Sequence, residues 1–349
     1  MTVAKKSTWP TAVALAVGAY AICTALHASA NVTVVAVLVA LYLPSYLDGA
    51  ELTGERYWPA FAAFSQKHLS GIKMTLEYEE PVDPNKQYMF CSHPHGLLSA
   101  HHGILMQGSS EPCKSTHSHH PPHHALCYLP VQRINNPPFG ARYTAFHELS
   151  PMASRRHLAA SVVFRIPLYR EYCLWLGCVD ANRKVAERVL QNEKSLVILV
   201  GGIAEQMLAK RGEQTIYVQK RKGHIRLALK YGTPIVPGYG FGETDLYTHS
   251  DFLLSFRRMI AKKFSVALLV GYGSSRWFPV LPHKGVKINQ VFGKPIPVRK
   301  IDSPSAEDID KLHAQYVDEL VRVFDKYKEK YGYKDATLQL DGHSPFLLV

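Results

Sequence analysis

An uncharged run of 41 residues near the N-terminus constrains the possible folds of this chain more than any other feature. No Lys, Arg, Asp or Glu occurs from Ser7 to Leu47. A membrane-spanning helix needs about 20 apolar residues, so the run is long enough for two short helices with a polar break between them. We therefore expect Trp9–Leu26 and Val32–Leu47 to form a membrane hairpin within residues 1–53. Two lysines precede the run, which favours a cytosolic location for both of its ends.

Two alternatives to the hairpin stay open. The pair Lys5-Lys6, the apolar stretch and Ala28-Ser29-Ala30 match the charged start, the apolar centre and the cleavage site of a signal peptide. Cleavage there would leave a second apolar segment at the new N-terminus, which a secreted soluble enzyme does not need. A single span is the other alternative, but the run is about twice the length of one spanning helix.

Composition and charge indicate a globular protein with an anionic partner. The chain is 47% hydrophobic and 19% charged, which is enough to bury a core and excludes wholesale disorder. Its net charge is +12, and residues 251–300 hold ten basic residues against Asp251 alone. No nucleic-acid-binding motif accompanies this charge, so we expect no nucleic-acid partner. The six cysteines include no CxxC pair and are predicted to be reduced thiols in a cytosol-facing protein.

Short β-rich runs alternate with helical ones beyond residue 53, which favours an α/β sheet covered by helices on both faces. The expected strands are Gln87–Ser92, Leu196–Val200, Thr215–Gln219, Pro234–Tyr239, Ser265–Val270 and Val286–Phe292. The expected helices are Ser154–Arg165, Ala181–Asn192, His224–Tyr231 and Ala306–Tyr331, the last with a capping box at Ser305 and Asp308.

Two further segments are compositionally distinct. Residues 109–124 are rich in histidine and contain Pro121-Pro122, so we expect a surface loop; the His and Cys spacing matches no standard zinc site, and no metal site is predicted. Residues 252–264 place several large apolar side chains on one helical face and cations on the other, which is typical of an interfacial helix on a membrane surface.

The tetrapeptide His93-Pro94-His95-Gly96 follows directly on a predicted strand, where an open α/β sheet usually binds its ligand. Two imidazoles on a rigid turn suit general-base chemistry near neutral pH, although a purely structural turn would have the same sequence. No G-x-S-x-G, H-E-x-x-H or Walker sequence is present, which removes the commonest serine hydrolase, zincin and P-loop interpretations.

Glycine-rich segments follow two other predicted strands. Gly201-Gly202 and Glu205 come after the first, and Phe241-Gly242-Glu243 end the second. Between them, Arg221-Lys222-Gly223 places a basic pair at the start of a predicted helix, where an anion can bind.

Five runs in this order resemble the type-2 diacylglycerol acyltransferase family, which also includes monoacylglycerol and wax-alcohol acyltransferases. They are HPHG, PLYREY, GGIAE, RKGHIRLALKYGTPIVPGYGFGE and VFGKPIP, and the resemblance spans roughly residues 54–331. It implies a glycerolipid-acyltransferase-like central sheet flanked by helices in residues 54–349, after the membrane hairpin. It also implies an acyl-CoA-dependent O-acyltransferase of the endoplasmic reticulum membrane and lipid droplets. His224 departs from the pattern, because a Phe is usual there, and the His-rich segment looks like an insertion.

For such a reaction we expect His95 to take the proton of the acceptor hydroxyl and His93 to orient it or bind alongside. Glu205 is the first choice and Glu243 the second for the acid that holds the imidazole. The thioester already carries a good leaving group, so no covalent intermediate is needed, and Cys91 is predicted to pack in a strand. The predicted substrate-binding residues are Pro94, Gly96, Gly201, Gly202, Arg221, Lys222, Gly223, Phe241, Gly242 and Glu243, with the two cations and the basic stretch contacting the phosphates of CoA.

The resemblance leaves the acceptor open. Diacylglycerol is the first choice, and monoacylglycerol and long-chain alcohols are the alternatives. We expect acyl-CoA as co-substrate with no further cofactor, a membrane partner and a homo-oligomer. A different class of function, a non-catalytic lipid-droplet or membrane-surface protein of the same fold, would use the helix at 252–264 for attachment.

Overall fold

The computed structural model describes residues 9–68, 74–80, 82–83, 85–107, 111–112, 155–275 and 281–340. The expected His-rich loop at 109–124 lies outside the described residues except for Glu111 and Pro112, which form a short edge strand.

A mixed eight-stranded sheet forms the centre of the protein, in the order β3-β1-β11-β8-β2-β6-β4-β5. Strand β2 lies in its interior and runs parallel to both neighbours, β8 and β6, whereas β11 is antiparallel to β8. The strands are β1 (Met74–Tyr78), β2 (Met89–His93), β3 (Glu111–Pro112), β4 (Arg155–Ala159), β5 (Cys178–Asp180), β6 (Ser195–Leu199), β8 (Ile235–Phe241) and β11 (Ile288–Phe292).

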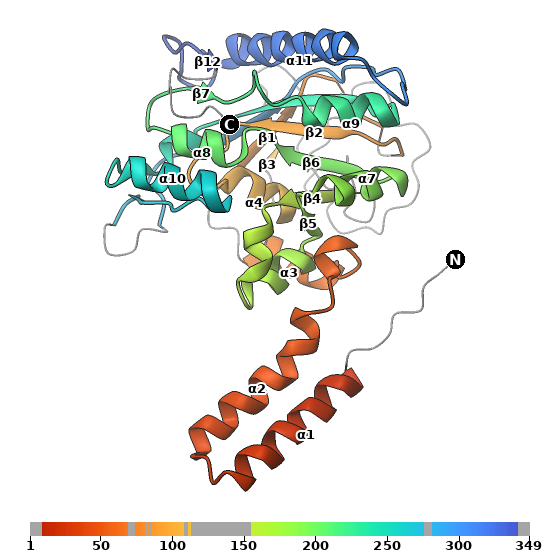
Figure 1. The fold of residues 1–349 in the computed structure, drawn as a ribbon. Helices are drawn as coiled ribbons and strands as arrows, with labels where there is room; N and C mark the ends of the chain where they lie inside the picture. Colours follow the sequence, from red (N-terminus) through yellow and green to blue (C-terminus); the bar gives the residue numbers. More distant parts are fainter. Residues whose placement is uncertain are drawn as a thin grey trace, which may run out of the picture.

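Helices cover both faces of this sheet, so the predicted α/β architecture is confirmed. Alternate side chains of β2 point to opposite faces: Met89 and Cys91 join a core with α7 (Arg183–Gln191), α9 (Gly223–Tyr231) and α11 (Ala306–Tyr327). Phe90 belongs to the other core, under α4 (Ala100–Gln107). Figure 1 shows α9 and α11 on one side of the sheet and α4 on the other.

The capping box and apolar stripe of the last predicted helix are confirmed, but the helix ends at Tyr327 and not at Tyr331. Helix α11 begins after Ser305, whose side chain accepts the backbone N–H of Asp308, and the Asp308 carboxylate accepts the backbone N–H of Ser305 in return. Its apolar stripe is buried on the sheet.

Two predicted elements are wrong. The segment Ser154–Arg165 was expected to be helical, but it contains strand β4 and a 3₁₀ helix, η3 (Ser161–Arg165). β4 lies between β6 and β5, and its pairing with them overrides the local helical pattern. The expected strand Ser265–Val270 is irregular, and only β10 (Gly271–Tyr272) pairs after it, with β9 (Thr248–His249). The strand expected at Thr215–Gln219 is shorter, β7 (Thr215–Ile216), and pairs with β12 (Gln339–Leu340).

The N-terminal segment forms two antiparallel helices that project away from the sheet (Figure 1). These are α1 (Trp9–Ala25) and α2 (Ala30–Tyr46), which pack against each other. By length and composition, Ala30–Leu52 can cross a membrane, whereas the apolar part of α1, Pro10–Ala25, is shorter. The two packed helices have the arrangement of the predicted hairpin, and their location in a membrane stays a prediction.

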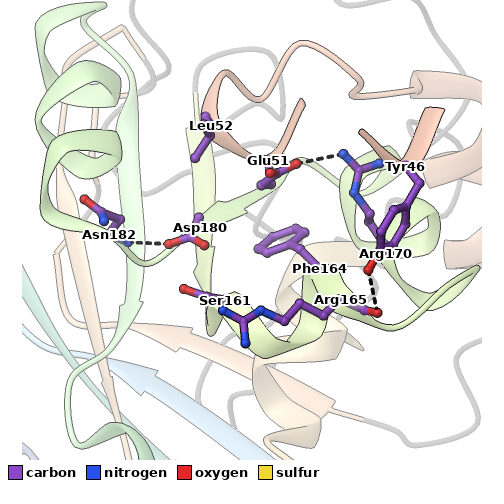
Figure 2. Close-up of a pocket in the computed structure, with 9 residues that line it drawn as sticks. All are labelled: Tyr46, Glu51, Leu52, Ser161, Phe164, Arg165, Arg170, Asp180 and Asn182. Atoms are coloured by element: carbon purple, nitrogen blue, oxygen red, sulfur yellow. Dashed lines mark hydrogen bonds and ion pairs between the residues drawn. The ribbon is translucent and has the colours of Figure 1, made fainter. Parts of the chain in front are cut away.

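A buried arginine links the C-terminal end of α2 to the rest of the protein. Arg170, on α6 (Tyr169–Trp175), forms ion pairs with Asp48 at 2.8 Å and Glu51 at 2.7 Å, and it donates to the carbonyl of Ser45 at 2.9 Å. A cavity of about 350 Å³ opens beside this cluster, and none of the predicted site residues lines it. Figure 2 shows Arg165 and Asp180 facing it from the domain and Tyr46 from the end of α2.

Candidate active site

The HPHG turn begins at the carboxyl end of β2, where β6 and β8 also end. Helix α8 (Gly202–Leu208) follows β6 and supplies Glu205, and the 3₁₀ helix η4 (Glu243–Asp245) follows β8 and supplies Glu243. Because parallel strands bring their carboxyl ends to one edge, residues more than 100 positions apart in the sequence meet at this turn.

Glu205 is the centre of the site. One oxygen of its buried carboxylate lies 2.8 Å from His93 Nδ1 and accepts the backbone N–H of Tyr217 at 2.7 Å. The other accepts the backbone N–H of His95. Burial pushes the pKa of Glu205 up, but the imidazole of His93 and the N–H of Tyr217 outweigh burial, so the pKa lies below its usual value. An added Cβ at Gly201 would lie 2.2 Å from this carboxylate, so the glycine makes room for it.

The two histidines of the motif have different surroundings. His93 is fully buried, and its ring contacts the Glu205 carboxylate. His95 is half-buried, and its ring Nδ1 lies 2.8 Å from Ser99 Oγ. Burial lowers the pKa of His95, and the charge of Glu205 partly offsets that effect. His95 is therefore a neutral imidazole near pH 7, the form that a general base requires.

The structure corrects one part of the predicted geometry. Glu205 was expected to hold the ring of His95, but it contacts the ring of His93 and only the main chain of His95. The ring of His95 is held by Ser99, a residue that the sequence analysis did not select. Ser99 lies just beyond the motif, but Ser is common in such turns and gives no distinctive sequence signal.

Glu243 stabilises the turn from the opposite side. Its oxygens accept the backbone N–H groups of Ala100 and His101 at 2.9 Å each, and Nδ1 of the His101 ring lies 3.0 Å away. It thus caps the first turn of α4. Gly96 has φ +60°, and an added Cβ there would lie 2.5 Å from Glu243, so only glycine fits.

The two predicted cations, Arg221 and Lys222, lie directly before α9 and differ in their contacts. The Arg221 guanidinium lies 5.1 Å from the ring centre of Tyr217, the residue whose backbone N–H donates to Glu205. Lys222 is half-buried and pairs with Asp310 at 2.6 Å. Gly223 is the first residue of α9.

Phe241 does not line the candidate site, contrary to the sequence prediction. It is fully buried and stacks on Phe324 of α11 with ring centres 5.6 Å apart, because alternation along β8 points it into the core. Gly242 has φ +92°, and an added Cβ would lie 2.1 Å from the carbonyl oxygen of Lys287, so its role here is close backbone packing.

Cys91 is a poor nucleophile in this structure. Its side chain is fully buried in β2, and burial raises the pKa of its thiol, so the thiol stays protonated. Among the described residues, no three His, Cys, Asp or Glu side chains gather as a metal site would require.

Comparison with known proteins identifies the family. A family model described as diacylglycerol acyltransferase matches residues 137–341, which is more than half of the chain. The 2-acylglycerol O-acyltransferase 1 of Bos taurus is 31% identical over 262 residues, covering 72% of this chain and 68% of that protein.

Other relatives cover more of the chain. The diacylglycerol O-acyltransferase 2 of Xenopus tropicalis is 29% identical, and the match covers 90% of this chain and 82% of that protein. The acyl-CoA wax alcohol acyltransferase 2 of Mus musculus is 27% identical, and the match covers 82% of this chain and 78% of that protein. The solved 1-acyl-sn-glycerophosphate acyltransferase of Thermotoga maritima gives a TM-score of 0.41 at 12% identity, covering 84% of this chain and 81% of that chain. On the family model and the curated relatives, the chain belongs to the diacylglycerol acyltransferase family and is an O-acyltransferase.

Proposed function

We propose that this protein is an acyl-CoA:diacylglycerol acyltransferase that makes triacylglycerol at the cytosolic face of the endoplasmic reticulum membrane and on lipid droplets. The description of the family model and the extent of the match to a diacylglycerol O-acyltransferase support this acceptor. The observation that carries the chemistry is the Glu205 carboxylate, which binds the ring of His93 and the main chain of His95 at the end of β2.

In this proposal the ring of His95 is the general base, because it is the more accessible imidazole of the motif. It takes the proton of the acceptor hydroxyl while the hydroxyl oxygen attacks the thioester carbonyl. The new C–O bond replaces the C–S bond, and the imidazolium returns the proton to the departing CoA thiolate. The negative charge of Glu205 stabilises the imidazolium during this step.

The remaining parts of the proposal concern binding. The phosphates of CoA bind the cationic surface near Arg221 and the basic stretch 251–300. Lys222 contributes less in our view than the sequence suggested, because Asp310 already pairs with it. The lipid acceptor enters from the membrane that residues 1–53 anchor, and no cofactor beyond acyl-CoA is invoked. Self-association into a homo-oligomer remains part of the proposal.

The decisive experiment supplies purified full-length protein with labelled oleoyl-CoA and one acceptor at a time. We expect label in triacylglycerol when diacylglycerol is the acceptor, resolved by lipid chromatography. Label chiefly in diacylglycerol or in wax ester would replace the proposed acceptor by a monoacylglycerol or a long-chain alcohol. Those two alternatives are supported by the names of the bovine and murine relatives. Transfer to none of the three acceptors would contradict the proposal and favour the non-catalytic alternative.

A further inference from the structure

Three buried polar atoms lie behind the HPHG turn without a hydrogen-bond partner in the described part of the chain. They are Nε2 of His93, Nε2 of His224 and the hydroxyl of Tyr316. The three residues are at most 7% exposed and come from β2, α9 and α11. A buried polar atom without a partner destabilises a fold, and native proteins commonly satisfy such atoms with an ordered water.

The three side chains are neighbours. The ring centre of Tyr316 lies 4.9 Å from that of His224 and 6.4 Å from that of His93. This spacing allows one small oxygen ligand to contact all three. The cluster lies on the sheet face that α11 covers.

The donors and acceptors of the cluster define the ligand. Nδ1 of His93 faces the carboxylate of Glu205, a contact that favours the ring tautomer with its proton on Nδ1 and leaves Nε2 of that tautomer as an acceptor. His224 bonds to the backbone of Arg221, and burial lowers its pKa to about 3, so it is neutral and its Nε2 is an acceptor too. Burial raises the pKa of Tyr316, so its hydroxyl keeps its proton and can donate. Two acceptors and one donor match a water molecule, which donates twice and accepts.

We propose that His93, His224 and Tyr316 bind one buried water molecule, and that His224 and Tyr316 are thereby positioning residues of the active site. A water that donates to Nε2 keeps the proton of His93 on Nδ1, facing Glu205. The ring of His93, oriented in this way, holds the Glu205 carboxylate, which also accepts the backbone N–H of His95. The effect on turnover rests on the proposed function, whereas the water site itself does not.

The test is Tyr316→Phe in the full-length protein, assayed for melting temperature and for kcat and KM with oleoyl-CoA and diacylglycerol. We expect a lower melting temperature and a kcat about tenfold lower with KM unchanged, which is the loss of roughly one buried hydrogen bond. Tyr327→Phe is the matched control. It removes a hydroxyl from the same helix, but the hydroxyl of Tyr327 bonds to Glu79 and not to the proposed water. The control should keep the wild-type kcat.

A second pair of variants separates polarity from packing. His224→Phe keeps a ring of similar size but loses Nε2, so it should lower kcat like Tyr316→Phe. His224→Gln keeps an acceptor and should restore part of that loss. A higher melting temperature in Tyr316→Phe would overturn the water site, because it would mean that the hydroxyl had no partner. A lower melting temperature with unchanged kcat would overturn the positioning role.

These outcomes differ from a failure of the proposed function. If His95→Ala kept wild-type turnover, the general-base assignment would fall, while the melting temperature of Tyr316→Phe would still report on the water site.

Discussion

A single carboxylate sets the geometry of both motif histidines. Glu205 contacts the ring of His93 and accepts from the main chain of His95 and the main chain of Tyr217, so three groups from two segments of the chain converge on it. A carboxylate held by several donors is fixed in place and remains ionised. The accessible imidazole of His95 is therefore carried on a rigid turn, and its own ring is oriented separately by Ser99.

We predict a graded loss of activity at this site. His95→Ala should abolish acyl transfer, because proton transfer contributes about 10²- to 10⁴-fold to the rate. His93→Ala should impair it severely, because it removes the ring partner of Glu205. Glu205→Gln should cost less than His95→Ala, since the imidazole remains but is poorly held. Turnover of oleoyl-CoA with diacylglycerol is the measurement.

Glu243→Gln is the control for the second carboxylate, which braces the start of α4. Its effect should be on folding yield more than on the kcat of the folded fraction. All variants must first match the wild type in expression and membrane association. If well-folded His95→Ala protein kept wild-type turnover, the general-base mechanism would be wrong.

The pH dependence of the reaction should reveal the same base. Burial lowers the pKa of His95, and a base acts in its unprotonated form, so kcat/KM should fall only at a pH below the ordinary histidine value of about 6.5. In Glu205→Gln the charge that raises the pKa of His95 is lost, so the acid limb should move to lower pH. A movement to higher pH would contradict this assignment.

The proximity of His93, His95 and Glu205 was predictable from the sequence, but which imidazole the carboxylate contacts was not. The strand-turn context of His93 and His95 and the position of Glu205 after a buried strand follow from local sequence. Which imidazole the carboxylate meets depends on how α8 and the segment near Tyr217 pack on the turn, and no spacing encodes that. Phe241 was misplaced for a related reason: its direction depends on the register of β8 with β2 and β11.

At the scale of elements, α10 (Leu254–Phe264) has the exposed apolar face that its sequence predicted. Phe256, Met259 and Phe264 on the helix, and Phe252 just before it, are each about half exposed or more. Arg257 does not belong to the cationic face, contrary to the sequence analysis. It is buried, and it donates to the backbone carbonyls of Ser250 and Leu268. The exposed cations of the helix are Lys262 and Lys263.

We predict that α10 contacts the membrane surface. The double substitution Lys262→Gln and Lys263→Gln should weaken binding to anionic vesicles by about 2 kcal/mol, roughly 30-fold, at about 1 kcal/mol per cation. Lys86→Gln with Lys334→Gln is the matched control, because it removes the same charge from exposed positions elsewhere. Equal binding of both double variants at low salt would count against an interfacial role for α10.

Elements with a strong local pattern were predicted best. The capping box and the long stripe of α11 define it without any tertiary information. The segment from Ser154 to Arg165 is the opposite case, since its apolar spacing fits a helix but β4 pairs between two buried strands. A strand inside a sheet needs partners far away in the sequence, and a local pattern cannot supply them.

At the scale of the whole molecule, the helix pair α1 and α2 and the α/β domain meet at a small polar junction. Arg170 forms ion pairs with Asp48 and Glu51 there. The hydroxyl of Tyr46 donates to the carbonyl of Arg165 at 3.0 Å, and Figure 2 shows this bond together with the pair of Arg170 and Glu51. The HPHG turn and its carboxylates make no contact with this junction among the hydrogen bonds of the described residues. The helix pair and the candidate site are therefore structurally separate.

This separation predicts the effect of deleting residues 1–47. The deletion removes both apolar helices but leaves Asp48 and Glu51, so Arg170 keeps its ion pairs with both of them and with Glu171, and the buried guanidinium stays paired. We expect the shortened protein to fold, to lose membrane retention in fractionation and to keep part of its activity in detergent. The same deletion combined with Asp48→Asn and Glu51→Gln should fold poorly, because Arg170 would then retain only Glu171 as an ion-pair partner. If N-terminal sequencing of the full-length protein instead found cleavage after Ala30, a signal peptide would replace the membrane hairpin.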